Sequence, residues 1–441
     1  RGICQSYLRR TPPPGKQILV ILDGLDEAID WTPGRGLFPG DPPEGLRVLM
    51  TARLRAVESG PQGWAAAVGW DDKRLAHIAV LPGLTRIGVE EALASMGNQL
   101  DKLATQMDIV SELYRLCQGD PLLVRLYVDA LVAKGNSVMS LKVKELRAIQ
   151  PGLQGYFERW EKEQNEQWRM QGRDPIIEQA RLRLLLNTVA SAFGPLTHND
   201  LAALADELAD GLLVRRLAQM AGRWLIGNGK TQGYTFSHPR LGYYFWEQLG
   251  STEQTDLDTR FTTWGMRILD ALSSGALYPK AAPRYIIQHY GDHLKRSVAS
   301  AERYYELISD GWRKAWEEID VSSAGFLKDV KRVREQARRA YTPTKQGRAK
   351  ALIQQIKGAL CQASVVTLGG NVKPRLLAQL VEAGLYTPVQ ALAIIKLVPN
   401  EGQQAEMLAA LASHLSGELM EEALAATRAI GDESCRAEAL V

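Results

Sequence analysis

The chain of 441 residues lacks the features that mark membrane and secreted proteins. No stretch approaches the roughly 20 consecutive apolar residues that a membrane-spanning helix needs. Its four cysteines (Cys4, Cys117, Cys361 and Cys435) lie far apart and form no Cys-x-x-Cys pair, which argues against a disulfide framework or a zinc module and favours the cytoplasm. No signal peptide is recognisable, because the first apolar run follows prolines and ends in acids.

An excess of charge of either sign is also missing. The chain has 53 basic and 50 acidic side chains, so a net charge of +3 provides no overall field for nucleic acid or anionic lipid. Hydrophobic residues make up 45% and charged residues 23%, which is ordinary globular composition. At roughly 100–200 residues per domain, the length predicts two to four domains. The sequence begins with Arg1 and stops inside an expected helix, so we expect a piece of a longer protein.

Residues 1–85 have the pattern of an α/β sheet. Three short apolar runs stand between loops rich in Gly and Pro, namely Ile18–Leu22, Leu46–Met50 and Ile78–Leu81. Runs of four or five apolar residues without alternation predict parallel strands that are buried on both faces. We therefore expect the fold class to be α/β, followed by a mainly α chain.

Helical patterns dominate from residue 86 onward. Three helices followed by the hairpin Trp224-Leu225-Ile226 and Tyr234-Thr235-Phe236 predict a winged helix. We expect a helical lid at 86–150, a winged-helix domain with a preceding linker helix at 151–250, a helical spacer at 251–345 and helical repeats at 346–441.

The last segment contains an internal repeat. Ala391-Leu392-Ala393 aligns with Ala423-Leu424-Ala425, and Ala405-Glu406 aligns with Ala437-Glu438, at an offset of 423 − 391 = 32. A period in the thirties predicts units of two helices that stack as a solenoid.

The segment Ile18–Glu27, which reads ILVILDGLDE, carries the strongest chemical signal. A buried strand that ends in Asp23 places a carboxylate at the carboxyl edge of a parallel sheet, where ligands bind in α/β folds. The next strand delivers Thr51-Ala52-Arg53 to the same edge. In a plainer interpretation, Asp26 and Glu27 only favour the first turn of a helix. Arg53 then only forms a salt bridge with Asp23 or Glu27.

This pattern resembles the Walker B and sensor 1 segments of STAND-class P-loop NTPases of the NACHT type. The matching residues are Asp23-Gly24, with acids at Asp26 and Glu27, and the Thr-Ala-Arg segment that ends in Arg53. The resemblance implies a P-loop NTPase parallel sheet in which Asp23 helps to hold Mg²⁺, Asp26 and Glu27 orient the attacking water, and Arg53 senses the γ-phosphate.

Two later segments follow in the order of that family. Gly119-Asp120-Pro121 resembles the Gly-x-Pro turn of the lid, which implies that Pro121 packs on adenine. The segment Tyr234–Pro239 resembles the winged-helix segment whose histidine, here His238, contacts the β-phosphate of bound ADP. Each residue has a plainer alternative, because Pro121 is also an ordinary first residue of a helix and His238 an ordinary hydrogen-bonded turn histidine.

One motif of the family is absent. No Gly-x-x-x-x-Gly-Lys-[Ser/Thr] sequence occurs, and the candidates Gly15-Lys16 and Gly229-Lys230 lack its flanking pattern. We therefore expect the phosphate-binding loop to lie upstream, and we expect this chain alone to bind nucleotide poorly and to hydrolyse ATP hardly at all.

The resemblance implies a fragment of a signalling NTPase, with Mg²⁺ and ATP or ADP as cofactors, that acts as a nucleotide-dependent oligomerisation switch. It also implies self-association on activation, a protein ligand of the repeats as trigger, and a role in antiviral or stress sensing. Two alternatives stay open. One is a STAND-type transcription regulator, and the other is a non-enzymatic helical-repeat scaffold with a relic NTPase fold.

Two patterns in the spacer have structural explanations. Trp312 and Trp316 are four residues apart, which predicts a core stripe on one helix face. The basic run Lys328–Arg339 is interleaved with Asp329 and Glu335, which indicates a solvated helix face rather than a nucleic-acid surface.

Overall fold

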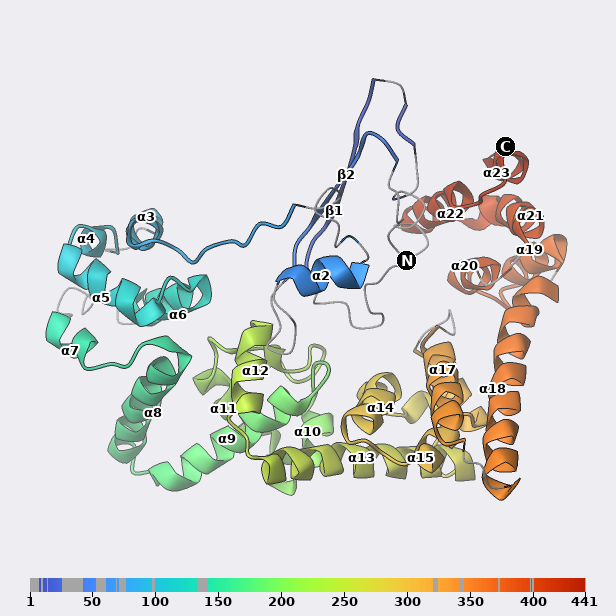
Figure 1. Cartoon of the computed structure of the whole chain (residues 1–441). Helices are drawn as coiled ribbons and strands as arrows, with labels where there is room; N and C mark the ends of the chain where they lie inside the picture. The colour runs from blue at the N-terminus through green and yellow to red at the C-terminus, as the bar shows by residue number, and fades with distance from the viewer. Residues whose placement is uncertain are drawn as a thin grey trace. The chain divides into compact units, whose positions relative to one another are not determined.

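The computed structural model is mainly helical and contains a small parallel sheet of two strands (Figure 1). The chain divides into two compact units, residues 83–362 and residues 1–82 with 363–441. The structure describes residues 8, 11–13, 15–25, 43–52, 61–68, 70, 77–96, 100–132, 142–319, 324–341, 345–371, 373–396, 398 and 400–440.

The first two predicted strands are present and parallel. β1 (Ile18–Leu22) pairs with β2 (Leu46–Met50) in a register that places Ile18 beside Leu46 and Leu22 beside Met50. One face of the pair packs on Leu8 and on Val68 and Trp70, which lie at and just after the end of α2 (Pro61–Val68).

Two expectations for this sheet are wrong. Burial alternates along β1, and Leu19 and Ile21 are 61% and 60% exposed, because the described residues cover only one face of the pair. The run Ile78–Leu81 forms no strand, and Leu81 is 89% exposed. Among the described residues this run has no neighbouring strand to complete its hydrogen bonds, and apolar composition alone does not make a strand.

Helices follow from residue 86, as predicted. They are α3 (Arg86–Ser95), α4 (Leu100–Ala104), α5 (Met107–Cys117), α6 (Pro121–Val132), α7 (Val143–Arg147) and α8 (Gly152–Met170). Thr85 caps the start of α3 by accepting a hydrogen bond from the Gly88 amide. The amphipathic helix α5 packs on α3, α6 and α7, and α6 also packs on α8.

The next elements have the predicted order of three helices and a hairpin. They are α9 (Pro175–Ser191), α10 (His198–Leu204), the short 3-10 helix η3 (Asp206–Leu208), α11 (Gly211–Met220), β3 (Leu225–Ile226), β4 (Thr235–Phe236) and α12 (Pro239–Glu247). β3 and β4 are antiparallel. An antiparallel bridge between Leu196 and Tyr234 adds the segment after α9 to the hairpin.

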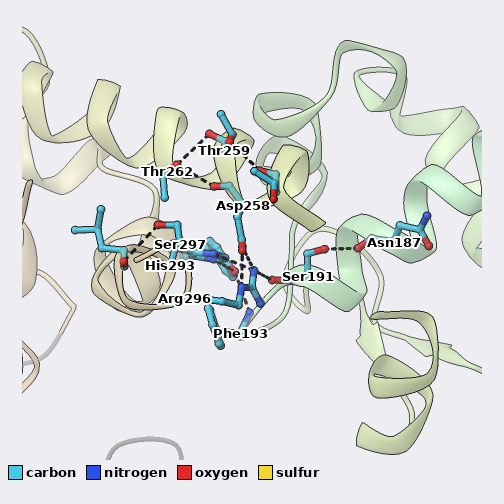
Figure 2. A network of polar contacts seen from close by, with 12 residues as sticks. Asn187, Ser191, Phe193, Asp258, Thr259, Thr262, His293, Arg296 and Ser297 are labelled. Atoms are coloured by element: carbon cyan, nitrogen blue, oxygen red, sulfur yellow. Dashed lines mark hydrogen bonds and ion pairs between the residues drawn. The ribbon is translucent and has the colours of Figure 1, made fainter. Parts of the chain in front are cut away.

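The spacer is helical throughout its described residues. It contains α13 (Ser251–Ser274), η4 (Pro279–Ala281), α14 (Arg284–Arg296), α15 (Ala301–Tyr305), α16 (Asp310–Glu317) and α17 (Ala324–Arg339). Arg296 links these helices to α9, since its guanidinium donates to Asp258 at 2.7 Å and to the Ser191 carbonyl at 2.6 Å (Figure 2). The predicted core stripe is confirmed, because Trp312 and Trp316 are 0% and 6% exposed.

The described residues of the C-terminal segment form a series of helices. They are α18 (Lys345–Asn371), α19 (Pro374–Glu382), α20 (Pro388–Lys396), α21 (Glu401–Leu411), α22 (Glu418–Arg428) and α23 (Glu433–Leu440). α21 and α23 begin 433 − 401 = 32 residues apart. α21 packs against both α19 and α23, so the apolar faces of successive helix pairs share one core. None of the helices in the described residues is long and apolar enough to cross a membrane.

Candidate functional site

Asp23 and Thr51 lie side by side at the carboxyl edge of the β1–β2 pair. The parallel register ends at Leu22 and Met50, so the next residue of each strand falls at the same level. The Thr51 hydroxyl donates a hydrogen bond to the Asp23 carboxylate and accepts one from the Gly24 amide at 2.9 Å. Gly24 has φ +66°, a left-handed conformation that glycine adopts without strain. Thr51 therefore fixes the Asp23 side chain at this edge.

The donor set at this edge fits a magnesium ion. Mg²⁺ in nucleotide sites takes one or two carboxylates, completes its shell with water and phosphate oxygens, and does not need an all-protein cage. Asp23 is exposed, and Thr51 orients its carboxylate. No cluster of three or more His, Cys, Asp or Glu side chains that could hold a metal occurs within the described ranges. Asp23 would thus hold such an ion as a single carboxylate.

Three of the predicted site residues, Asp26, Glu27 and Arg53, lie outside the described residues. Their roles in water activation and phosphate sensing remain predictions.

The Gly119-Asp120-Pro121 segment forms a tight turn between α5 and α6. Gln118 and Gly119 both have positive φ, at 51° and 74°. A Cβ atom on Gly119 would lie 2.5 Å from the Leu84 carbonyl oxygen, so only glycine fits this close approach. Asp120 caps α6 by accepting a hydrogen bond from the Leu122 amide at 3.0 Å, and Pro121 is the exposed first residue of the helix.

His238 caps the start of α12, as Asp120 caps the start of α6. Its Nδ1 atom accepts a hydrogen bond from the Arg240 amide at 3.2 Å, and Pro239 is the first residue of the helix. Because Nδ1 is the acceptor, the neutral ring carries its proton on Nε2. His238 is half-buried. The plainer alternatives therefore describe the local structure of both residues. Pro121 begins a helix, and His238 caps one.

An ion pair joins the two helix starts, which are more than a hundred residues apart in sequence. The Arg240 guanidinium forms an ion pair with the Asp120 carboxylate, through the oxygen that does not cap α6. Pro121 adjoins one partner, and His238 precedes the other by two residues. The ion pair therefore links the two chain segments that carry the predicted nucleotide residues, both within the unit of residues 83–362.

Sequence reasoning did not assign roles to Asp120 and Arg240. Asp120 stood inside a recognised motif, and its position before a proline is a signal for a helix cap. The pair it forms with Arg240 left no local signal, because nothing in a sequence alone connects charges 120 positions apart.

A cavity of about 750 Å³ lies elsewhere in the same unit. Its walls include Trp264, Tyr285 and His289 from α13 and α14, and Thr231 and Gln232 from the hairpin. The predicted nucleotide residues do not line it. The cavity is thus separate from the place where the α6 and α12 starts meet.

Comparison with known proteins gave no relative. No protein-family model matches the chain, and neither a curated protein nor a solved structure is significantly similar to it.

Proposed function

We propose that this chain forms part of a signalling NTPase of the STAND class, NACHT type, which switches between ADP-bound and ATP-bound states. The observation that carries the proposal is the Asp120–Arg240 ion pair, which links the helix that begins at Pro121 to the helix that His238 caps. The parallel strand pair with Asp23 at its carboxyl edge adds support. So does the order of helical lid, winged-helix elements and repeats.

In this proposal the predicted site residues have the following roles. Pro121 packs on the adenine ring, and His238 donates from Nε2 to a phosphate oxygen. Asp23 holds Mg²⁺, which when bound neutralises charge on the phosphate oxygens. Asp26 and Glu27 orient the attacking water, and Arg53 responds to the γ-phosphate. A phosphate-binding loop outside this chain completes the site, since no such sequence occurs within it.

The C-terminal helices supply the sensing surface in the proposal. A protein ligand bound there opens the ADP-bound form, which allows ATP to enter and copies of the protein to associate. This arrangement suits antiviral or stress sensing, and Mg²⁺ and ATP or ADP are its cofactors.

Replacement of Asp23 by Asn in the protein expressed from its whole gene tests the proposal. We expect ATP turnover to fall about a hundredfold, because the carboxylate at the metal is lost while its shape is kept. Asp101→Asn, on the exposed face of α4, is the control and should leave turnover unchanged. Undiminished turnover in the Asp23 variant would refute the proposal. A thermal stability indifferent to Mg²⁺ with ATP or ADP would favour the scaffold alternative.

One observation favours the transcription-regulator alternative. Arg215 on α11 and Lys230 on the hairpin both lower the pKa of His198, after the larger effect of burial, so positive charge gathers beside the third helix and the wing. Winged helices contact DNA with such elements. Retention on duplex DNA that weakens steeply with salt would support this alternative, and a flat response would count against it.

A further inference from the structure

We infer that Asp120 and Arg240 form a charged latch that holds the lid helix α6 and the winged-helix element α12 together without any bound nucleotide. Arg240 is then a positioning residue, which sets the distance between Pro121 and His238. The positioning role rests on the proposed function, whereas the latch itself does not.

The Asp120 carboxylate performs two tasks at once. Its Oδ1 atom accepts from the Leu122 amide at 3.0 Å and so caps α6, while Oδ2 binds the Arg240 guanidinium. The Asp120 side chain is 12% exposed and the Arg240 side chain 55% exposed, so the carboxylate is sheltered while its partner reaches it from the surface. Breaking the pair would leave a largely buried carboxylate with the α6 cap as its remaining partner. This cost favours the arrangement in which the pair joins α6 to α12.

Arg240 connects the other helix in the same way. Its backbone amide donates to His238 Nδ1 at 3.2 Å, and its side chain reaches Asp120. A chain of contacts therefore runs from the Leu122 amide through Asp120 and Arg240 to the His238 ring. The Asp120–Arg240 pair therefore links the starts of α6 and α12.

A second support lies beneath the two helices. Tyr127 of α6 packs edge-on against Tyr156 of α8 at 5.1 Å between ring centroids. The neighbouring Phe157 stacks on Tyr244 of α12 at 4.8 Å. These aromatic contacts keep both helices attached to α8 when the latch is broken, so latch variants remain folded and their effect is confined to the helix starts.

The test is hydrogen–deuterium exchange of the nucleotide-free protein in two peptides, residues 119–126 and 238–245. Arg240→Gln removes the charge from α12, and Asp120→Asn removes it from α6 while keeping an effective cap. We expect each variant to raise exchange about two- to five-fold in both peptides, the size of a partly exposed ion pair. The effect of Arg240→Gln on residues 119–126 is decisive, because this substitution changes no atom of α6.

Two comparisons make the result specific. Arg125→Gln, which removes an exposed arginine of α6 whose pair with Asp129 is 3.8 Å long, should leave both peptides unchanged. In the double variant Asp120→Asn/Arg240→Gln the exchange should match a single variant and not their sum.

Salt provides a measurement without any substitution. Raising the ionic strength from about 0.05 to 0.5 M should increase exchange in both wild-type peptides and should have little effect in Arg240→Gln. Changes confined to the peptide that carries the substitution, or additive effects in the double variant, would overturn the latch. Loss of ATP turnover is not part of this test, so a failed latch and a failed NTPase proposal give different results.

Discussion

Arg296 on α14 and Asp258 on α13 form a partly buried ion pair that also reaches α9. The Arg296 Nε atom donates to Asp258 Oδ1 at 2.7 Å, and a second nitrogen donates to the Ser191 carbonyl at 2.6 Å. The guanidinium lies 4.5 Å from the ring centroids of Phe193 and Trp246. Figure 2 shows the Arg296 side chain directed at Asp258 and Ser191. One side chain thus joins α13 and α14 to α9.

Replacement of Arg296 by Met should destabilise the protein by about 3 to 5 kcal/mol, because Asp258 is only 7% exposed and would keep its charge without its partner. Urea unfolding followed by tryptophan fluorescence measures this loss. Arg260→Met is the matched control, since Arg260 pairs with Asp256 one turn along α13 and that carboxylate is 60% exposed. We expect a loss of less than about 0.5 kcal/mol there. Equal losses in the two variants would contradict this account.

A second prediction concerns the two indole groups that share one carboxylate oxygen. Trp312 and Trp316 each donate from Nε1 to Asp329 Oδ2 at 3.0 Å. Trp312→Phe removes one donor to a carboxylate that is 1% exposed, and we expect a loss of about 1 to 3 kcal/mol from this bond in addition to the lost packing. Urea unfolding followed by far-UV circular dichroism measures the total.

Trp168→Phe separates the hydrogen bond from the packing. Trp168 is 2% exposed, and among the described residues its Nε1 atom has no hydrogen-bond partner. Both substitutions remove the same volume, so the extra loss in Trp312→Phe reports the bond to Asp329. Losses that agree within error would mean that this bond contributes nothing to stability.

Much of the local structure could be predicted from the sequence. Ile18–Leu22 and Leu46–Met50 are strands, the hairpin is present, and α21 and α23 begin 32 residues apart. These features depend on short patterns of apolar residues, turn residues and spacing. The run Ile78–Leu81 has the same composition and forms no strand, because a strand also needs a neighbour that sequence spacing does not reveal.

The contacts between residues that are far apart in the sequence could not be predicted. The basic run Lys328–Arg339 predicted a solvated face, yet Arg332 is only 12% exposed and pairs with Asp329 and Asp292. The sequence pattern shows only the charges of one helix, whereas Asp292 lies on another helix, α14. The site shows the same limit. Motifs predict roles for Asp23, Pro121 and His238, but the Asp120–Arg240 contact that links two helix starts depends on the fold.

The third prediction is a pH dependence from His293, which is 0% exposed. Burial lowers its pKa well below 6.5, and the charges of Arg296 and His289 lower it further. Its Nε2 atom is hydrogen-bonded to the Tyr285 hydroxyl at 2.8 Å, and its Nδ1 atom faces the Arg296 guanidinium at 3.4 Å. The ring is therefore neutral in the folded protein.

The sign of the effect follows from proton binding. Below about pH 6.5 the unfolded chain protonates this histidine while the folded protein does not, so stability is lost as the pH falls. Relative to His293→Gln, the wild type should lose up to about 1.4 kcal/mol per pH unit between pH 6.5 and 5. Urea unfolding at each pH measures this slope. His414→Gln, in the C-terminal helices, should keep the wild-type slope, and a His293 variant with that slope would refute the assignment.

The last prediction tests whether the C-terminal repeats share one core. Leu392 on α20 is 1% exposed and packs in a cluster with Leu408 and Leu411 of α21. Leu392→Ala should destabilise these helices by about 2 to 5 kcal/mol through the cavity it leaves, with faster hydrogen–deuterium exchange across residues 374–430. Leu376→Ala removes the same atoms at a position that is 47% exposed, and exchange should change little. Faster exchange confined to α20 would show that the helix pairs unfold one at a time and do not share a core.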